Sequence, residues 1–272
     1  MRLFAALSLV LILTTGCDPI TKIMKSKDPE YKLRKAEDYF AKKKYNHAQQ
    51  LYEDVMPNYK GTARFEDIYY KYAYTAYHLR DYMNAENLFK TYMEVFPNSA
   101  RAEEMDYMRA FTFYKQSPKA ELDQTNTIKA MGMMQTFINT HPGSTRNKEA
   151  GAIVDACRTK LEAKDRNAAK LYFDIGQFRA SAVAYEALMN NYPDSEQTDL
   201  YKFMSIKAYY EFAQMSVDEK RTERYGKVVE SCQDFMDRFP QSGYAKQVQQ
   251  FLSLSQTQLK SIAHEQPSKT SA

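Results

Sequence analysis

Phe96-Pro97-Asn98-Ser99 is the string that decides how this chain folds, because variants of it recur along the sequence. An aromatic residue or His, then Pro, any residue and Ser also form His141-Pro142-Gly143-Ser144, Tyr192-Pro193-Asp194-Ser195 and Phe239-Pro240-Gln241-Ser242. Pro cannot continue a helix and disfavours the helical conformation in the residue before it, whereas Ser is a favoured helix N-cap. Each string therefore predicts the end of one helix joined to the start of the next. Met56-Pro57-Asn58 is a fifth, degenerate instance.

Small and aromatic residues between these strings follow the tetratricopeptide pattern of about 34 residues, in which small residues let two helices approach and aromatic residues fill the gap. In repeats one, two and four the small residues of the two helices are 12 positions apart: Ala36 and Ala48, Ala73 and Ala85, Ala169 and Ser181. Aromatic residues keep the same register, as at Tyr39, Tyr45, Tyr52, Tyr82, Phe89, Tyr172, Phe178 and Tyr185. We expect an all-α tetratricopeptide (TPR) solenoid of about five helix pairs.

Repeats three and five depart from this spacing in the same way. Ala110 and Ala130 are 20 positions apart, as are Ala208 and Val228, so each repeat carries eight extra residues between its helices. The extra residues fall in polar stretches around 116–124 and 215–224, and we expect them to be exposed loops on one edge of the solenoid. Insertions of this kind are often binding elements, but a plain solvated loop fits equally well.

Two further helices are expected outside the five pairs. A connecting helix begins at Ser144 and extends to about Lys164; because Gly and Pro are absent from 152–175, it is compatible with one long helix that continues into repeat four. A capping helix follows from Ser242 to about Ile262. The predicted organisation is repeats one to three over residues 29–143, then the connecting helix, repeats four and five and the cap over 144–262. The polar tail 263–272 is predicted to be disordered.

The N-terminus has the order of a secretory signal. Arg2 is followed by an apolar stretch over residues 3–13 and then by small residues up to Gly16 and Cys17. The apolar stretch is shorter than the roughly 20 residues that span a bilayer. We therefore predict that residues 1–16 are a cleaved signal peptide and that 17–28 form a lipidated tether.

Cys17 lies where the lipobox of bacterial lipoproteins places its acylated cysteine, although Thr14 stands where Leu is usual. Acyl chains such as palmitate contribute about 0.8 kcal/mol per buried methylene, so they hold a protein at a membrane without an apolar helix. Asp18 follows, and in some bacteria an acidic residue there retains lipoproteins in the inner membrane, whereas in others it does not. Cys17 is thus the predicted lipidation site, and the sorting between membranes is left open.

Composition argues against several classes of function. Lys and Arg number 38 against 34 Asp and Glu, which is too balanced for a nucleic-acid binder. Cys157 and Cys232 lie 75 residues apart in helical patterns, and we expect small buried side chains there rather than a disulfide. The four histidines are isolated, and the eight glycines form no phosphate-binding loop. We therefore predict no catalytic residue, no metal site and no cofactor.

The lipobox Cys17, the short spacer, the five tetratricopeptide units and the Tyr192-Pro193-Asp194-Ser195 type of junction together resemble the BamD family over nearly the whole mature chain. The resemblance implies a non-catalytic scaffold lipoprotein of the outer-membrane β-barrel assembly machine, lipid-anchored on the periplasmic face of the outer membrane. It implies that the N-terminal repeats bind unfolded outer-membrane β-barrel proteins and that the C-terminal repeats bind the POTRA region of BamA, beside other barrel-assembly subunits. No cofactor is implied.

Two other envelope functions are compatible with the same features. A TPR lipoprotein that organises cell-wall or division proteins is the leading alternative. A polysaccharide-binding repeat lipoprotein is a further one, but the absence of Trp removes the residue best suited to stacking on sugars.

An aromatic track in the N-terminal repeats is the candidate peptide groove. In residues 69–77, Tyr70, Tyr74 and Tyr77 form a stripe roughly 100° from the one that carries the small residues Ala73 and Ala76. Equivalent positions extend the track into repeats one and three, which gives the candidates Leu33, Phe40, Tyr70, Tyr74, Tyr77, Tyr107, Phe111 and Tyr114. The track either binds extended, aromatic-ended peptides or packs between repeats as core.

Overall fold

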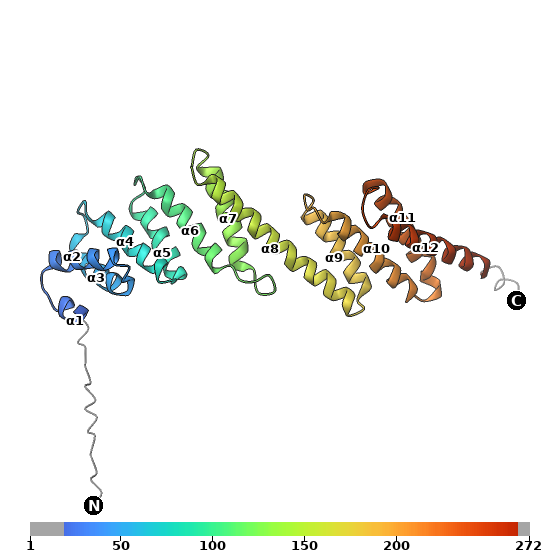
Figure 1. Cartoon of the computed structure of the whole chain (residues 1–272), viewed down its shortest axis with the longest axis horizontal. Helices are drawn as coiled ribbons and strands as arrows, with labels where there is room; N and C mark the ends of the chain where they lie inside the picture. Colours follow the sequence, from blue (N-terminus) through green and yellow to red (C-terminus); the bar gives the residue numbers. More distant parts are fainter. Residues whose placement is uncertain (1–18, 266–272) are drawn as a thin grey trace, which may run out of the picture. The chain divides into compact units, whose positions relative to one another are not determined.

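The structure is a computed structural model that describes residues 19–265 (Figure 1). Within these residues it has twelve helices and no strand, which confirms the all-α tetratricopeptide fold class. The helices are α1 (Pro19–Met24), α2 (Pro29–Ala41), α3 (Tyr45–Tyr59), α4 (Phe65–His78), α5 (Tyr82–Val95), α6 (Ala102–Gln116), α7 (Thr125–Thr140), α8 (Asn147–Asp174), α9 (Phe178–Asn191), α10 (Thr198–Gln214), α11 (Asp218–Arg238) and α12 (Ala245–Glu265).

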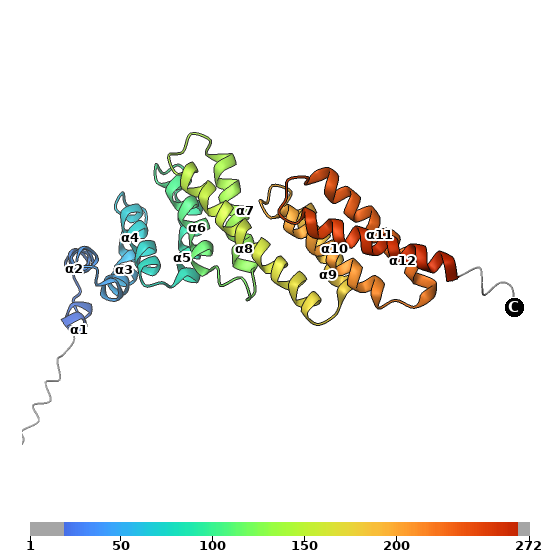
Figure 2. The same ribbon diagram turned by 45° about the vertical axis from the view of Figure 1, so that its right-hand side comes forward.

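The chain forms two compact units. The first comprises Met1–Gln116 and Met133–Ala150, and the second comprises Ser117–Gly132 and Gly151–Ala272. The boundary that the sequence predicts at 143/144 falls inside the first unit, and α7 and α8 each contribute residues to both. Within the second unit, α9 packs on α10, α10 on α11 and α11 on α12 (Figure 2).

Small residues lie where the paired helices touch. Ala36, Ala48, Ala73 and Ala85 are completely buried, as the spacing of 12 requires. In repeat four the hydroxyl of Ser181 donates a 2.9 Å hydrogen bond to the carbonyl oxygen of Ala169 across the same contact. A larger side chain at these positions would separate the two helices.

Ion pairs reveal the repeat length in the first unit. Arg64 pairs with Glu30 at 2.8 Å, Lys71 with Glu37 at 2.6 Å and Arg101 with Asp67 at 3.1 Å, and in each pair the partners are 34 residues apart. These contacts place the first helices of successive repeats, α2, α4 and the start of α6, side by side. Exposed pairs contribute about 0–1 kcal/mol each, so they mark the register more than they stabilise it.

The serine that ends each junction string, at Ser99, Ser144, Ser195 and Ser242, forms hydrogen bonds with two parts of the chain. Its Oγ accepts a hydrogen bond from the backbone N–H two residues later, at 3.0–3.2 Å. The same hydroxyl donates to a carboxylate on the first helix of the preceding repeat: Ser99 to Glu66 at 2.6 Å, Ser144 to Glu103 at 2.5 Å, Ser242 to Asp199 at 2.7 Å, and Ser195 to Glu162. The hydroxyl therefore orients the start of a new repeat and fixes it to the previous one.

The two insertions have different structures. Residues 117–124, between α6 and α7, contain no helix, in line with the expected loop. Residues 215–224 were expected to be a loop as well, and that expectation is wrong because α11 begins at Asp218. Asp218 and Glu219 occupy its first turn, and Lys220 pairs with Glu223 at 3.1 Å, so favourable helix-dipole and i,i+3 contacts extend the helix.

The predicted connecting helix continues past Lys164 into repeat four, as the absence of Gly and Pro from 152–175 allows. It runs through α8 to Asp174 as a helix of 28 residues. The predicted tether also contains a helix, because α1 lies within residues 17–28. Of the predicted tail, residues 263–265 belong to α12 and the rest lies outside the described residues.

Candidate protein-binding surfaces

The predicted signal peptide and the predicted lipidation site Cys17 lie outside the described residues. The helix nearest to Cys17 in the chain, α1, is well packed: Ile20 and Ile23 are each only 6% exposed and belong to the hydrophobic core of the first repeat with Leu33. Only two residues separate Cys17 from Ile20.

Two of the eight groove candidates are part of the core. Leu33 is 8% exposed and packs in the cluster that includes α1, and Tyr107 is 1% exposed. Tyr107 is covered by the guanidinium of Arg146, 4.7 Å from its ring, and by the ring of Phe137 at 5.5 Å. Their burial removes both as peptide contacts, because a ligand would first have to displace packed side chains.

Tyr70 and Tyr74 join repeat two to repeat three. The Tyr74 hydroxyl donates to Glu104 of α6 at 2.7 Å, and the Tyr70 hydroxyl reaches the same carboxylate at 3.3 Å. The guanidinium of Arg101 lies 4.3 Å from the Tyr70 ring. Burial, and then the hydrogen bond to Glu104, raise the pKa of Tyr74. Both tyrosines thus contribute to packing between repeats.

The other four candidates, Phe40, Tyr77, Phe111 and Tyr114, are half-buried. Phe40 packs edge-on to Tyr45 with ring centroids 5.7 Å apart. Tyr77, Phe111 and Tyr114 form a sequence of neighbouring rings across α4 and α6, with centroid separations of 6.3 Å and 5.9 Å. These three residues are the aromatic track that the structure leaves partly accessible.

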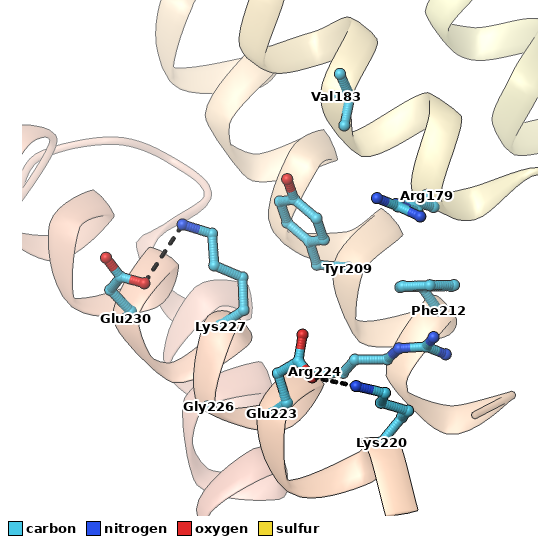
Figure 3. A pocket seen from close by; sticks show the side chains of 10 residues that line it. All are labelled: Arg179, Val183, Tyr209, Phe212, Lys220, Glu223, Arg224, Gly226, Lys227 and Glu230. Atoms are coloured by element: carbon cyan, nitrogen blue, oxygen red, sulfur yellow. Dashed lines mark hydrogen bonds and ion pairs between the residues drawn. The ribbon is translucent and has the colours of Figure 1, made fainter. Parts of the chain in front are cut away.

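A second concave surface lies in the second unit, among α9, α10 and α11 (Figure 3). We call it the α9–α11 groove; it has a volume of about 710 Å³. Its lining residues are Arg179, Val183, Tyr209, Phe212, Lys220, Glu223, Arg224, Gly226, Lys227 and Glu230. Sequence reasoning identified only the insertion that supplies Lys220, Glu223 and Arg224, because the other residues come together only through the packing of three helices.

The two cysteines among the described residues are buried. Cys157 and Cys232 are free thiols inside the second unit, and burial raises the pKa of Cys232 to about 12. A thiol that stays protonated at neutral pH is a poor nucleophile. Within residues 19–265, His, Cys, Asp and Glu form no group of three that could hold a metal ion. Over the same described residues, every helix is too short or too polar to cross a bilayer.

Stacked tetratricopeptide helix pairs with exposed grooves define a class of helical-repeat proteins that typically bind other proteins. A family model described as "YfiO: Outer membrane lipoprotein" matches residues 26–224. The chain therefore belongs to this outer membrane lipoprotein family, the BamD family. The family and the fold are typical of non-catalytic scaffolds.

Other comparisons are more distant. A solved structure described as the "TPR2AB-domain:pHSP90-complex of yeast Sti1" is similar over 84% of this chain and 98% of its own, with 11% identity and a TM-score of 0.38. A search among curated proteins gave no match.

Proposed function

We propose that this chain is a non-catalytic scaffold lipoprotein of the β-barrel assembly machine. It is anchored by Cys17 at the periplasmic face of the outer membrane, and it binds BamA and unfolded outer-membrane β-barrel proteins to promote barrel folding and insertion. The observation that carries the proposal is the family match over residues 26–224, which spans α2 to α10 and the start of α11. The helical-repeat fold supports it, because such stacks offer extended surfaces for protein ligands.

The N-terminal repeats bind the substrate in this proposal. Tyr77, Phe111 and Tyr114 supply half-buried aromatic surface with hydroxyl groups at the edges, which suits an extended peptide with an aromatic end. A variant that carries both Tyr77→Ser and Tyr114→Ser tests the track. The measurement is how well this variant captures the C-terminal strand peptide of a barrel protein. We expect weaker capture at an unchanged melting temperature, with Tyr172→Ser, a tyrosine 42% exposed on α8, as the control. Unchanged capture would contradict the track.

The C-terminal repeats dock the POTRA region of BamA. Support comes from exposed apolar side chains in the insertion of repeat five, where Met215 is 73% and Val217 64% exposed. Changing both to Asp leaves the core intact and puts charge on this surface. We expect loss of co-purification with BamA, while the same change at Met83, which is 78% exposed, leaves it intact.

Pull-down of the tagged chain from detergent-solubilised membranes tests the whole assignment. Recovery of a barrel protein that contains POTRA domains is the expected result. Recovery of cell-wall or division proteins without such a barrel would favour the alternative that the chain organises those proteins.

A further inference from the structure

The α9–α11 groove is large and open enough to hold part of another protein. Its volume is about 710 Å³. Six of its lining residues are exposed, so it is a groove along the surface rather than an enclosed cavity: Arg179, Val183, Lys220, Glu223, Lys227 and Glu230. An open groove suits an extended protein segment better than a small molecule.

Two of the four cations in the groove are already paired. Lys220 lies 3.1 Å from Glu223, and Lys227 lies 3.3 Å from Glu230, so both lysines have a carboxylate on their own helix (Figure 3). Arg179 and Arg224 have no carboxylate partner among the side chains that the structure describes. The groove therefore carries two guanidinium groups in excess of its acidic residues.

Phe212 lies between these two arginines. Figure 3 shows the side chain of Arg179 on one side of Phe212 and that of Arg224 on the other. The Arg224 guanidinium is 3.9 Å from the ring centroid of Phe212 and donates a hydrogen bond of 2.5 Å to Ser216. Arg224 is therefore held by Phe212 and Ser216. Because the planar guanidinium binds carboxylates through paired hydrogen bonds, Arg179 offers the groove a binding group for a carboxylate.

Apolar surface continues beside the charges. Val183 is 52% exposed one helical turn from Arg179 on α9, and Phe212 is half-buried. A ligand that satisfied both features would carry an acidic group next to an apolar side chain.

Gly226 belongs to the lining of the groove on α11. It lies in the interior of α11, where Gly is less favourable to a helix than Ala. A Cβ atom added at Gly226 would have no neighbouring atom within 4 Å, so packing inside the chain does not require the glycine. Its missing side chain instead leaves the groove open on the side of α11.

We propose that the α9–α11 groove binds an extended segment of a partner protein in which an Asp or Glu side chain adjoins an apolar side chain. The carboxylate binds the guanidinium of Arg179, and the apolar side chain covers Val183 and Phe212. Gly226 provides room for the backbone of the segment.

Selection from a displayed library of random dodecapeptides tests the proposal. The full chain is the bait, and the Gly226→Leu variant, which fills the groove, removes peptides that bind elsewhere. We expect enriched peptides in which an acidic residue adjoins Phe, Tyr, Leu or Val. Failure to enrich any peptide, or enrichment of peptides without an acidic residue, would overturn the proposal.

Fluorescence anisotropy then measures how tightly the most enriched peptide binds to the chain and to its variants, which identifies the residues that hold the carboxylate. We expect at least about tenfold weaker binding after Glu→Gln or Asp→Asn in the peptide, and a similar loss with Arg179→Gln, because a charge-assisted hydrogen bond is lost in each case. Arg221→Gln is the matched control, since Arg221 lies on α11 outside the lining and pairs with Asp218. Equal losses with Arg179→Gln and Arg221→Gln, or a requirement for the free C-terminal carboxylate of the peptide, would overturn it.

Glycine-to-alanine variants separate binding from stability. Gly226→Ala should raise the melting temperature and weaken peptide binding. Gly151→Ala, a change with equally open surroundings in α8, should raise the melting temperature without affecting binding. Unchanged binding by Gly226→Ala and Gly226→Leu alike would show that the segment does not occupy the groove.

Discussion

At each junction between repeats, one serine hydroxyl bonds to the helix that begins and to the repeat that precedes it. The string of aromatic residue, Pro, any residue and Ser is enough to predict the helix end and the helix start. It cannot identify the acceptor of the hydroxyl, because Glu66 lies 33 residues before Ser99 and Glu103 lies 41 residues before Ser144. Only the packing of successive repeats brings these groups together.

Ser99→Ala should lower the free energy of unfolding by about 1 kcal/mol, because it removes a capping acceptor and the donor to Glu66 together. Urea denaturation followed by circular dichroism measures the change. Ser253→Ala, an exposed position on α12, is the control and should change little. An effect of Ser99→Ala no larger than that of the control would show that the junction contacts do not stabilise the fold.

Glu66 should make stability depend on pH. Hydrogen bonds from Ser99 and Tyr92 hold the pKa of its carboxyl below the usual 4.5. Since the folded-state pKa is the lower one, the contribution to stability is complete above the usual pKa and is lost as the pH falls below it. The melting temperature of Glu66→Gln should therefore fall less steeply than that of the parent chain between about pH 5 and pH 3. Parallel curves would contradict this role of Glu66.

Among the elements, the five helix pairs were predictable and two helix starts were not. The spacing of 12 between Ala36 and Ala48 predicts that their two helices touch at these small residues. In the structure both alanines are completely buried. Residues 215–224 look like a polar loop in sequence, but acidic residues in the first turn and pairs such as Lys220 with Glu223 make them helical from Asp218. The α9–α11 groove could not be predicted, since Arg179, Phe212 and Arg224 belong to three helices.

The start of α1 is the second helix start that the sequence did not predict. The burial of α1 in the core of the first repeat leads to a prediction about stability. Ile23→Ala removes buried side-chain volume from the core of the first repeat and should cost about 2 kcal/mol. Ile128→Ala is the control, because Ile128 is 54% exposed and should change stability by less than about 0.5 kcal/mol. Thermal unfolding measures both. Equal melting temperatures for the two variants would mean that α1 is not part of the folded repeat.

For the molecule as a whole, the proposed attachment through Cys17 determines where the repeats act. Within residues 19–265 no helix is long and apolar enough to cross a membrane. Cys17→Ala should therefore yield a chain that is not processed at this site or is released from the outer-membrane fraction. Fractionation followed by immunoblotting measures the outcome, with Cys157→Ala as the control, since that thiol is buried in the second unit. A Cys17→Ala chain of mature size in the outer-membrane fraction would contradict the anchor.

The role in barrel assembly is tested most directly by depleting the chain from its own cells and quantifying barrel proteins in the outer membrane by heat-modifiable gel migration. We expect folded barrels to decrease while unfolded barrel proteins accumulate in the periplasm, and we expect the intact chain to restore them. Normal levels of folded barrels in depleted cells, with a defect confined to the cell wall or to division, would contradict this role.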